Sequence, residues 1–170
     1  MKDTLPLFLL IVIPSFFTVM LGQVMHRLKL TWTADAGGTT AQTSSTFRIL
    51  FWIGIITWIL INFVPYLPRF FLDEYGQPTD AYYNVNFLCQ AVVLVYAIYK
   101  TVLICKTRKY IREQYGIPEQ QCHGCEDCCC SWWCSCCTVA QMARHTGDYD
   151  AYAGVCCNET GLPPHAPSIV

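Results

Sequence analysis

The sequence predicts a mainly α-helical membrane protein, with three transmembrane helices followed by a small, loop-dominated, cysteine-rich module in the cytosol. Three observations predict this fold class. The 170 residues are 54% hydrophobic and only 14% charged, whereas a typical soluble domain has about 25% charged residues. Three long runs are apolar enough to cross a hydrocarbon core of about 30 Å. Finally, eight of the eighteen residues from Gln120 to Cys137 are cysteine.

The three apolar runs give the expected transmembrane helices at residues 1–30, 48–69 and 85–106. The first run carries no charge between residues 5 and 25, the second is uncharged from 49 to 68, and the third contains Gln90 and Lys100. The runs are apolar all round rather than on one face, which favours membrane helices over the buried helices of a soluble bundle. The first run is longer than the 7–15 apolar residues of a signal peptide, so we interpret it as a retained helix.

Charge asymmetry predicts the orientation, because cytoplasmic loops are enriched in Lys and Arg. The flexible loop at residues 31–47 is flanked by Arg27, Lys29 and Arg48, whereas the loop at residues 70–84 is acidic. After the third run come four basic residues: Lys106, Arg108, Lys109 and Arg112. We therefore expect the N-terminus on the outer side and the cysteine-rich tail in the cytosol. The membrane is expected to be the plasma membrane or an endomembrane. The glycosylation sequon that starts at Asn158 should then remain unmodified.

The cysteine-rich module is expected at residues 107–160, followed by an extended tail at residues 161–170. Cytosolic thiols are kept reduced, which favours metal thiolates over disulfides, and Cys-x2-Cys spacing lets two thiolates bind one tetrahedral ion. We predict one or two zinc ions, with His123 and His145 as further donors. The predicted metal ligands are cysteines: Cys122, Cys125, Cys128, Cys129, Cys134, Cys136, Cys137, Cys156 and Cys157.

Other fates of these thiols stay open. An iron–sulfur cluster is disfavoured, because Trp132 occupies the fourth position of the ferredoxin-like run. Acylation near the Trp132-Trp133 pair and disulfide formation are alternatives, and Cys89 and Cys105 are expected to be small buried apolar residues. Neighbouring cysteines are expected to point in different directions. Glu126 and Asp127 are interpreted as solvating the loop.

The remaining sequence excludes several function classes. A net charge of −1 gives no electrostatic basis for binding nucleic acid. The chain has no nucleophile elbow, zinc-protease motif or phosphate-binding loop, so we expect that it is not an enzyme.

A short helix is expected from Thr138 to Thr146, stopped by Gly147. The polar side chains of the runs, such as Asn62 and Gln90, are interpreted as forming hydrogen bonds between helices.

Residues 106–145 resemble the second half of the placenta-specific-eight Cys-rich family, which includes plant cadmium-resistance and cell-number-regulator proteins. The basic segment is followed by a Tyr-Gly-Ile-Pro element, a thiol cluster and a Cys-x-x-x-Gln-x-x-Arg element, and the usual first cysteine motif of the family is replaced by further apolar runs. The residues that carry this motif are Tyr115, Gly116, Pro118, Gln141 and Arg144.

The resemblance implies a small membrane protein that self-associates and acts in the homeostasis or transport of divalent metals such as zinc, cadmium or calcium. The alternative is a non-catalytic accessory or scaffold subunit of a larger membrane complex, with a structural metal or disulfide module. The C-terminal residues Ser168-Ile169-Val170 resemble a ligand for PDZ-type domains, which would suit the second function.

Overall fold

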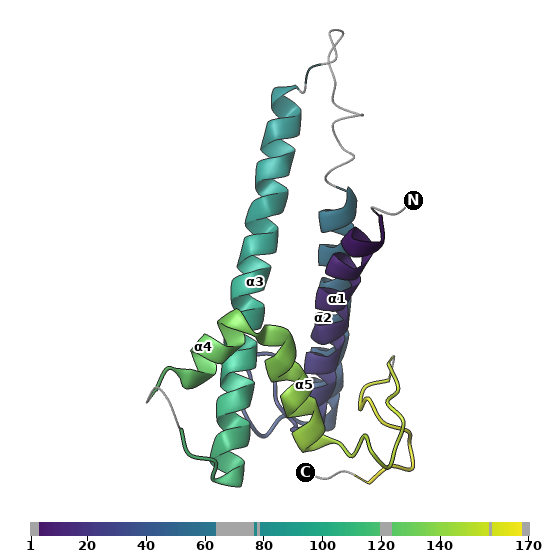
Figure 1. The fold of residues 1–170 in the computed structure, drawn as a ribbon, viewed down its shortest axis with the longest axis vertical. Coiled ribbons are helices and arrows are strands. Elements are labelled where there is room, and N and C mark those ends of the chain that lie inside the picture. Colours follow the sequence, from purple (N-terminus) through teal and green to yellow (C-terminus); the bar gives the residue numbers. More distant parts are fainter. Residues whose placement is uncertain (1–3, 64–76, 78, 120–123, 157, 168–170) are drawn as a thin grey trace.

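The computed structural model describes residues 4–63, 77, 79–119, 124–156 and 158–167. This part of the chain is helical and contains no strand. Helices α1, α2 and α3 lie along the long axis, and α4 and α5 cross it near one end (Figure 1). The five helices are α1 (Thr4–Arg27), α2 (Thr40–Phe63), α3 (Asp80–Tyr115), α4 (Glu126–Trp133) and α5 (Ser135–Thr146).

Two of the described helices, α2 and α3, are long and apolar enough to cross a membrane. The prediction of three such helices is therefore wrong in number. The first apolar run does form a helix, α1, but its last turns are buried within the protein, where Leu21, Val24 and Met25 are fully inaccessible. An apolar helix can form part of a protein core or cross a membrane, and the spacing of its apolar residues does not distinguish these two roles.

Helix α1 packs closely along α2 at two glycines. A Cβ atom on Gly22 would lie 3.1 Å from the ring of Phe47, and one on Gly54 would lie 3.4 Å from Thr18. Small residues at such positions let two apolar helices approach each other. A larger side chain at either glycine would separate α1 from α2.

Helix α2 begins at Thr40, eight residues before the expected start of the second span at residue 48. The backbone N–H of Thr39 donates to the Gln42 side chain at 3.0 Å, and the Gln42 N–H donates to Thr39 Oγ1 at 3.4 Å. This reciprocal pair is a capping box. It converts part of the segment that was expected to be a flexible loop into helix.

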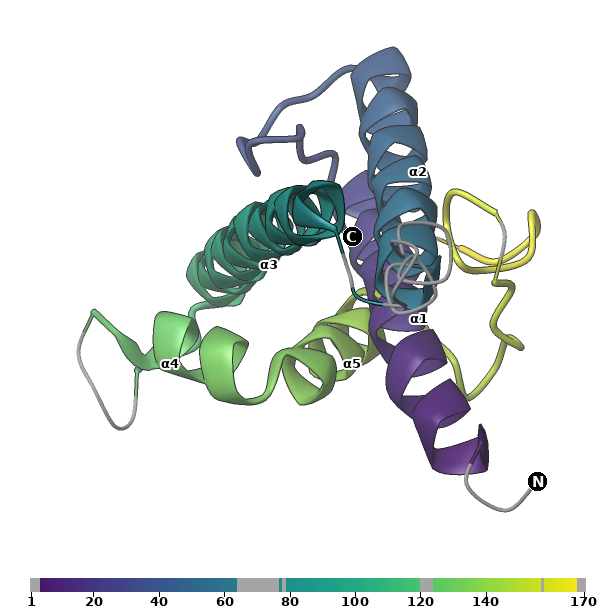
Figure 2. The same cartoon turned by 90° about the horizontal axis from the view of Figure 1, so that it is seen from above.

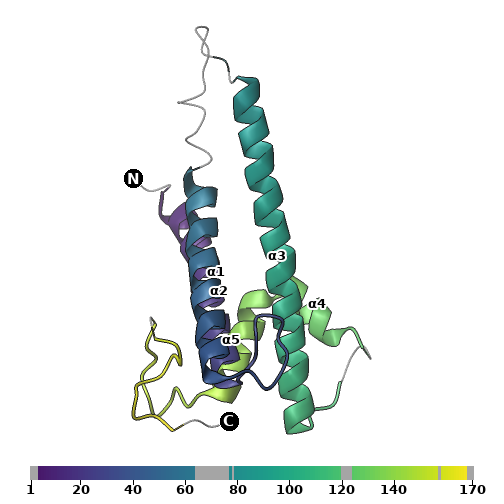
Figure 3. The ribbon, with the colours of Figure 1, turned by 180° about the vertical axis from the view of Figure 1, so that it is seen from behind.

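The remaining loop, residues 28–39, bridges α1 to the lower half of α3 (Figure 3). The Tyr99 hydroxyl donates to the Trp32 carbonyl at 2.8 Å, and Lys106 Nζ donates to the Thr33 carbonyl at 3.1 Å. Further up α3, the Tyr96 hydroxyl bonds to Thr18 Oγ1 at 3.0 Å. These bonds fix α3 beside α1 at the end of the molecule that also holds α4 and α5.

The cysteine-rich module is more helical than expected. Helices α4 and α5 meet at Cys134 and run beside α3 and α1 (Figure 2). Helix α5 includes the helix expected from Thr138 to Thr146 and starts three residues earlier, at Ser135. Its buried side chains Val139, Met142 and Ala143 join those of α1 and α3 in one core cluster. The module is thus a helical layer packed against α1 and α3.

A buried amide on α1 binds the backbone of the C-terminal segment. Gln23 Nε2 lies within hydrogen-bond distance of three backbone carbonyls, those of Val155 at 3.1 Å, Cys156 at 2.8 Å and Asn158 at 3.1 Å. Residues 161–167 form no helix or strand. The segment therefore lies along α1, to which Gln23 attaches it.

Candidate functional site

The thiols of the described chain lie mostly at the end of the molecule where α4 and α5 cross. Of the predicted metal ligands, Cys122 and Cys157 lie outside the described residues, as do the expected donor His123 and the three C-terminal residues. Cys89 lies on α3, far along the chain from the others. The described cysteines at the α4–α5 end, apart from Cys128, are Cys125, Cys129, Cys130, Cys134, Cys136, Cys137 and Cys156.

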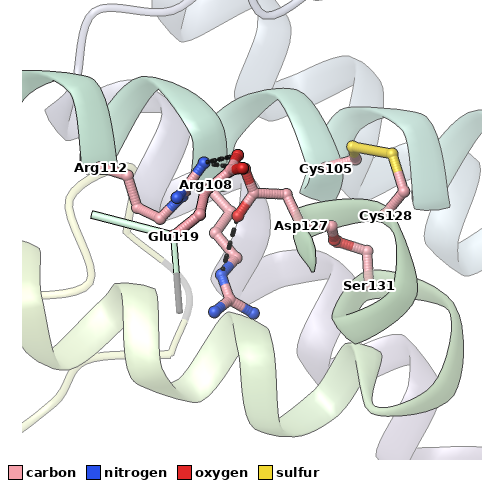
Figure 4. The surroundings of a disulfide bond; sticks show 7 residues. All are labelled: Cys105, Arg108, Arg112, Glu119, Asp127, Cys128 and Ser131. Atoms are coloured by element: carbon pink, nitrogen blue, oxygen red, sulfur yellow. Dashed lines mark hydrogen bonds and ion pairs between the residues drawn. A yellow bond between two sulfur atoms is a disulfide. The ribbon is translucent and has the colours of Figure 1, made fainter. Parts of the chain in front are cut away.

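A disulfide bond between Cys105 and Cys128 joins α3 to α4 (Figure 4). The sequence predicted Cys128 as a metal ligand and Cys105 as a small apolar residue in a span, and the structure instead pairs the two. Cys105 lies at the last turn of the apolar run, directly before the basic segment. This position, at the end of the apolar run, is the feature of the sequence that could have indicated that Cys105 lies near the later cysteines.

Beside the disulfide, two arginines of α3 bind the first turn of α4 (Figure 4). Arg112 Nη2 lies 2.8 Å from Asp127 Oδ2 and 2.7 Å from Glu119 Oε1. Arg108 Nε lies 3.2 Å from Asp127 Oδ1, and its Nη2 lies 3.4 Å from Glu126. Asp127 is buried, with 8% of its side chain exposed. The interpretation of Glu126 and Asp127 as solvating residues is therefore wrong, because both connect helices.

The family-motif residues shape this connection. Gly116 ends α3 in the left-handed conformation, at φ 64°, and its N–H donates to the Arg112 carbonyl. That turn redirects the chain after Tyr115, through Pro118, toward α4. On α5, Gln141 and Arg144 are exposed, on the face away from the core.

Two neighbouring thiols at the start of α5 point toward each other. Cys136 Sγ and Cys137 Sγ are 3.9 Å apart, and the Cys137 side chain is exposed. Lys100 of α3 lies close enough to Cys136 for a charge interaction. The expectation that adjacent cysteines point in different directions therefore fails for this doublet.

No three His, Cys, Asp or Glu side chains converge on a common point within the described residues. A structural zinc site takes four ligands in tetrahedral arrangement. Among the described members of the predicted ligand set, Cys136 and Cys137 lie side by side, Cys128 is bonded to Cys105, and Cys125 is exposed at the start of α4. His145 is exposed on α5. The doublet can supply half of such a site.

The comparison with protein families matches residues 8–145 to the PLAC8 family. The match begins within α1 and ends within α5, so it includes the first two helices, which the resemblance in the sequence had left out. No curated protein and no solved structure matches the chain. The chain belongs to the PLAC8 family.

Proposed function

We propose that this protein is an integral membrane protein that binds soft divalent metal ions through exposed thiols at its cytosolic end. It would act in metal homeostasis as a homo-oligomer and catalyse no reaction. The observation that carries the proposal is the 3.9 Å separation of Cys136 Sγ and Cys137 Sγ. Two sulfurs at about 2.3 Å from one tetrahedral zinc lie about 3.8 Å apart. The doublet is therefore spaced as one edge of a zinc site.

A doublet supplies two ligands, and the exposure of Cys137 supports completion by a second copy of the chain. Two copies would contribute four thiolates, which is a complete tetrahedral set. Zinc and cadmium, which bind thiolates well, fit this donor set better than calcium, which prefers oxygen ligands.

The distribution of charge supports a cytosolic position for this end. The C-terminus of α1, the α1–α2 loop, the C-terminal turns of α3 and the cysteine-rich module all lie at the same end of the molecule (Figure 1). The basic side chains of these segments include Arg27, Lys29, Arg108 and Arg112. Segments next to spans carry excess Lys and Arg on the cytosolic side.

The proposal is tested by metal content and oligomeric state together. The full chain, purified in mild detergent and loaded with zinc, should contain about one zinc for every two chains at this doublet, in line with four thiolates per ion. Replacing both Cys136 and Cys137 with serine should remove that zinc and lower the dimer fraction. Replacing Cys125 and Cys134, which are exposed and lie outside the doublet, is the matched control. Zinc content that is unaffected by the first double variant would refute the proposal.

A second function, that of an accessory subunit, is favoured by the hydrogen bonding of the candidate spans. Asn62 Nδ2 donates to the Trp58 carbonyl at 2.6 Å, and Thr101 Oγ1 donates to the Ala97 carbonyl at 2.9 Å, both within their own helices. These polar groups thus form hydrogen bonds within their own helices, and they do not line a path for ions. Helix α3 also presents large exposed apolar side chains, among them Phe87 and Val95, to whatever surrounds it.

Ion flux separates the two functions. If the protein itself transports ions, vesicles that contain it alone should lose a zinc gradient faster than empty vesicles. If it is an accessory subunit, the gradient should persist and the protein should co-purify with a larger assembly. Serine at Cys136 and Cys137 should abolish flux in the first case and leave the assembly intact in the second.

A further inference from the structure

An apolar groove with a volume of about 590 Å³ lies between α3 and α4, apart from the Cys136–Cys137 doublet. Ile98, Thr101 and Val102 of α3 form one wall, and Cys129, Trp132 and Trp133 of α4 form the other. The Cys105–Cys128 disulfide fixes the two walls at one end of the groove. The ion pairs of Asp127 with Arg108 and Arg112 also join α4 to α3, so the two walls do not depend on the disulfide alone, which matters in a reducing cytosol.

The groove begins where the charged part of α3 gives way to its apolar part. Arg108 lies three residues after Cys105, or about 4.5 Å further along a helix that rises 1.5 Å per residue. In the other direction, Ile98 and Val102 are about half exposed on a helix that qualifies as a membrane span. One end of the groove thus lies at the level of the lipid headgroups, and the other is continuous with the surface that faces lipid tails.

The exposed tryptophans support this depth. Trp132 is 62% exposed and Trp133 is 83% exposed, although both are large apolar side chains. Tryptophan is enriched at the boundary between membrane and water. Helix α4 therefore lies with its tryptophans at the membrane surface, and Cys129 lies one turn before Trp133 on the same wall.

Cys129 is the free thiol of this groove. Cys128, beside it, is bonded to Cys105, whereas Cys129 is unbonded and exposed. Cys125 and Cys134 are also exposed, but neither lines the groove. A nucleophilic sulfur at the rim of a membrane-level apolar groove is suited to carry a hydrocarbon chain that then occupies the groove.

We propose that Cys129 is S-acylated and that its long-chain fatty acyl group lies in the groove between α3 and α4. The donor is a long-chain acyl-coenzyme A. The Cys129 sulfur attacks the carbonyl carbon of the donor thioester, a new sulfur–carbon bond forms, and the bond to the coenzyme A sulfur breaks. Coenzyme A leaves as a thiol and takes up the proton that Cys129 loses, so that nothing is oxidised or reduced. The attached chain would fix α4 to the membrane surface.

The test uses the full chain purified from membranes of cells that contain protein acyltransferases. Intact mass is measured before and after neutral hydroxylamine, which cleaves thioesters, and the modified peptide is mapped. The expected result is one long-chain acyl group, removed by hydroxylamine and located at Cys129. The adduct should disappear in Cys129→Ser and persist in the matched controls Cys125→Ser and Cys134→Ser.

A groove-filling variant, Val102→Trp, tests the role of the groove while leaving every thiol in place, and acylation of Cys129 should fall severalfold. Three results would overturn the proposal: no hydroxylamine-sensitive mass, an acyl group mapped to Cys125 or Cys134, or a lipid that co-purifies without a covalent bond to Cys129. The map of the wild-type chain decides the matter even if a variant fails to fold. Zinc binding at Cys136 and Cys137 is independent of each outcome.

Discussion

Asp127 is a buried carboxylate that connects two helices through two arginines. Its oxygens lie 2.8 Å from Arg112 and 3.2 Å from Arg108, and only 8% of its side chain is exposed. Burial of a charge is costly, but removing one partner from a buried pair costs more, because the other charge is left behind. The position of α4 on α3 therefore depends on this side chain as well as on the disulfide.

We expect Asp127→Asn to destabilise the protein by at least about 2 kcal/mol. The loss of one partner in a fully buried pair costs about 3–5 kcal/mol, and Glu119 and Glu126 remain to balance part of the arginine charge. The measurement is chemical unfolding in mild detergent. Lys109→Gln is the control, since Lys109 forms an exposed pair with Glu113 that should contribute about 0.3–0.5 kcal/mol. Equal effects of the two variants would contradict the prediction.

His26 is the residue through which pH should act on the C-terminal segment. It lies at the end of α1, with Nε2 3.5 Å from Glu159. Burial lowers the pKa of His26, and the nearby Glu159 carboxylate offsets only part of that effect. The folded protein therefore takes up the proton less readily than the unfolded chain. The contribution of the neutral form to stability is fully present above a pH of about 6.5 and is lost as the pH falls below that value.

Lowering the pH from about 7.5 to about 5.5 should therefore reduce the thermal stability of the wild type more than that of His26→Gln, which cannot titrate in this range. The readout is the difference in unfolding temperature between the two proteins at each pH. Taking this difference removes the contributions of carboxylates such as Glu159 that both proteins share. A difference that does not change with pH would show that His26 is equally easy to protonate in both states.

At the scale of elements, α5 packs against both α1 and α3 at the cysteine-rich end of the molecule. Val139, Met142 and Ala143 are each at most 3% exposed, and they contact buried residues of both neighbouring helices. Met142 and Ala143 lie next to the exposed Gln141 and Arg144 in sequence, so one face of α5 is core and the other is surface. The orientation of the Cys136–Cys137 doublet follows from how this face packs.

Enlarging Ala143 to leucine should move α5 and destabilise the protein by about 1–3 kcal/mol, the usual cost of overpacking a core. The doublet, nearly two helical turns away, should then react faster with a maleimide reagent. Arg144→Leu is the matched control, because it adds an apolar side chain on the exposed face. The labelling rate of Cys137 relative to the exposed Cys129 of α4 is the measurement. Unchanged labelling in Ala143→Leu would separate the doublet from the packing of α5.

Sequence patterns predicted the elements that depend on local chemistry and missed those that depend on pairing. The apolar runs predicted the helices α1, α2 and α3, and the pattern from Thr138 to Thr146 predicted most of α5. The start of α2 was missed, although the Thr39–Gln42 capping box is a local signal. The Cys105–Cys128 bond joins residues more than ten positions apart, and so does the ion pair between Arg112 and the buried Asp127. No spacing rule decides such contacts, so the candidate site was predicted as a list of thiols and not as a geometry.

At the scale of the whole molecule, the basic segments, the thiols and the C-terminal segment occupy one end. The sequon residue Asn158 belongs to that end and its side chain is fully engaged. Asn158 Nδ2 donates to the Leu162 carbonyl at 2.5 Å, and Oδ1 accepts from the Gly161 N–H at 2.5 Å and from Thr160 Oγ1 at 3.3 Å. A glycan on Nδ2 would remove the bond to Leu162.

We therefore expect Asn158 to be unglycosylated in the cell, as the proposed cytosolic orientation also requires. Treating the protein from cell membranes with a glycosidase should leave its mass unchanged. A membrane-impermeant maleimide should label the exposed Cys137 in inside-out vesicles and leave it unlabelled in intact cells. A glycosidase-sensitive mass, or labelling from outside, would reverse the orientation and place the Cys136–Cys137 doublet in an oxidising compartment.

The attachment of the C-terminal segment to Gln23 has a consequence for how the protein is made. Gln23 leaves the ribosome early, but the carbonyls that it binds are 132 to 135 residues further along the chain. Because contacts over such distances form late, α1 lacks these partners until residues 155–158 have been synthesised. A chain that stops before residue 155 would leave a buried amide without acceptors on an apolar helix. Cellular quality control should recognise a chain in which the Gln23 amide lacks these acceptors, so truncated products should be degraded rather than accumulate.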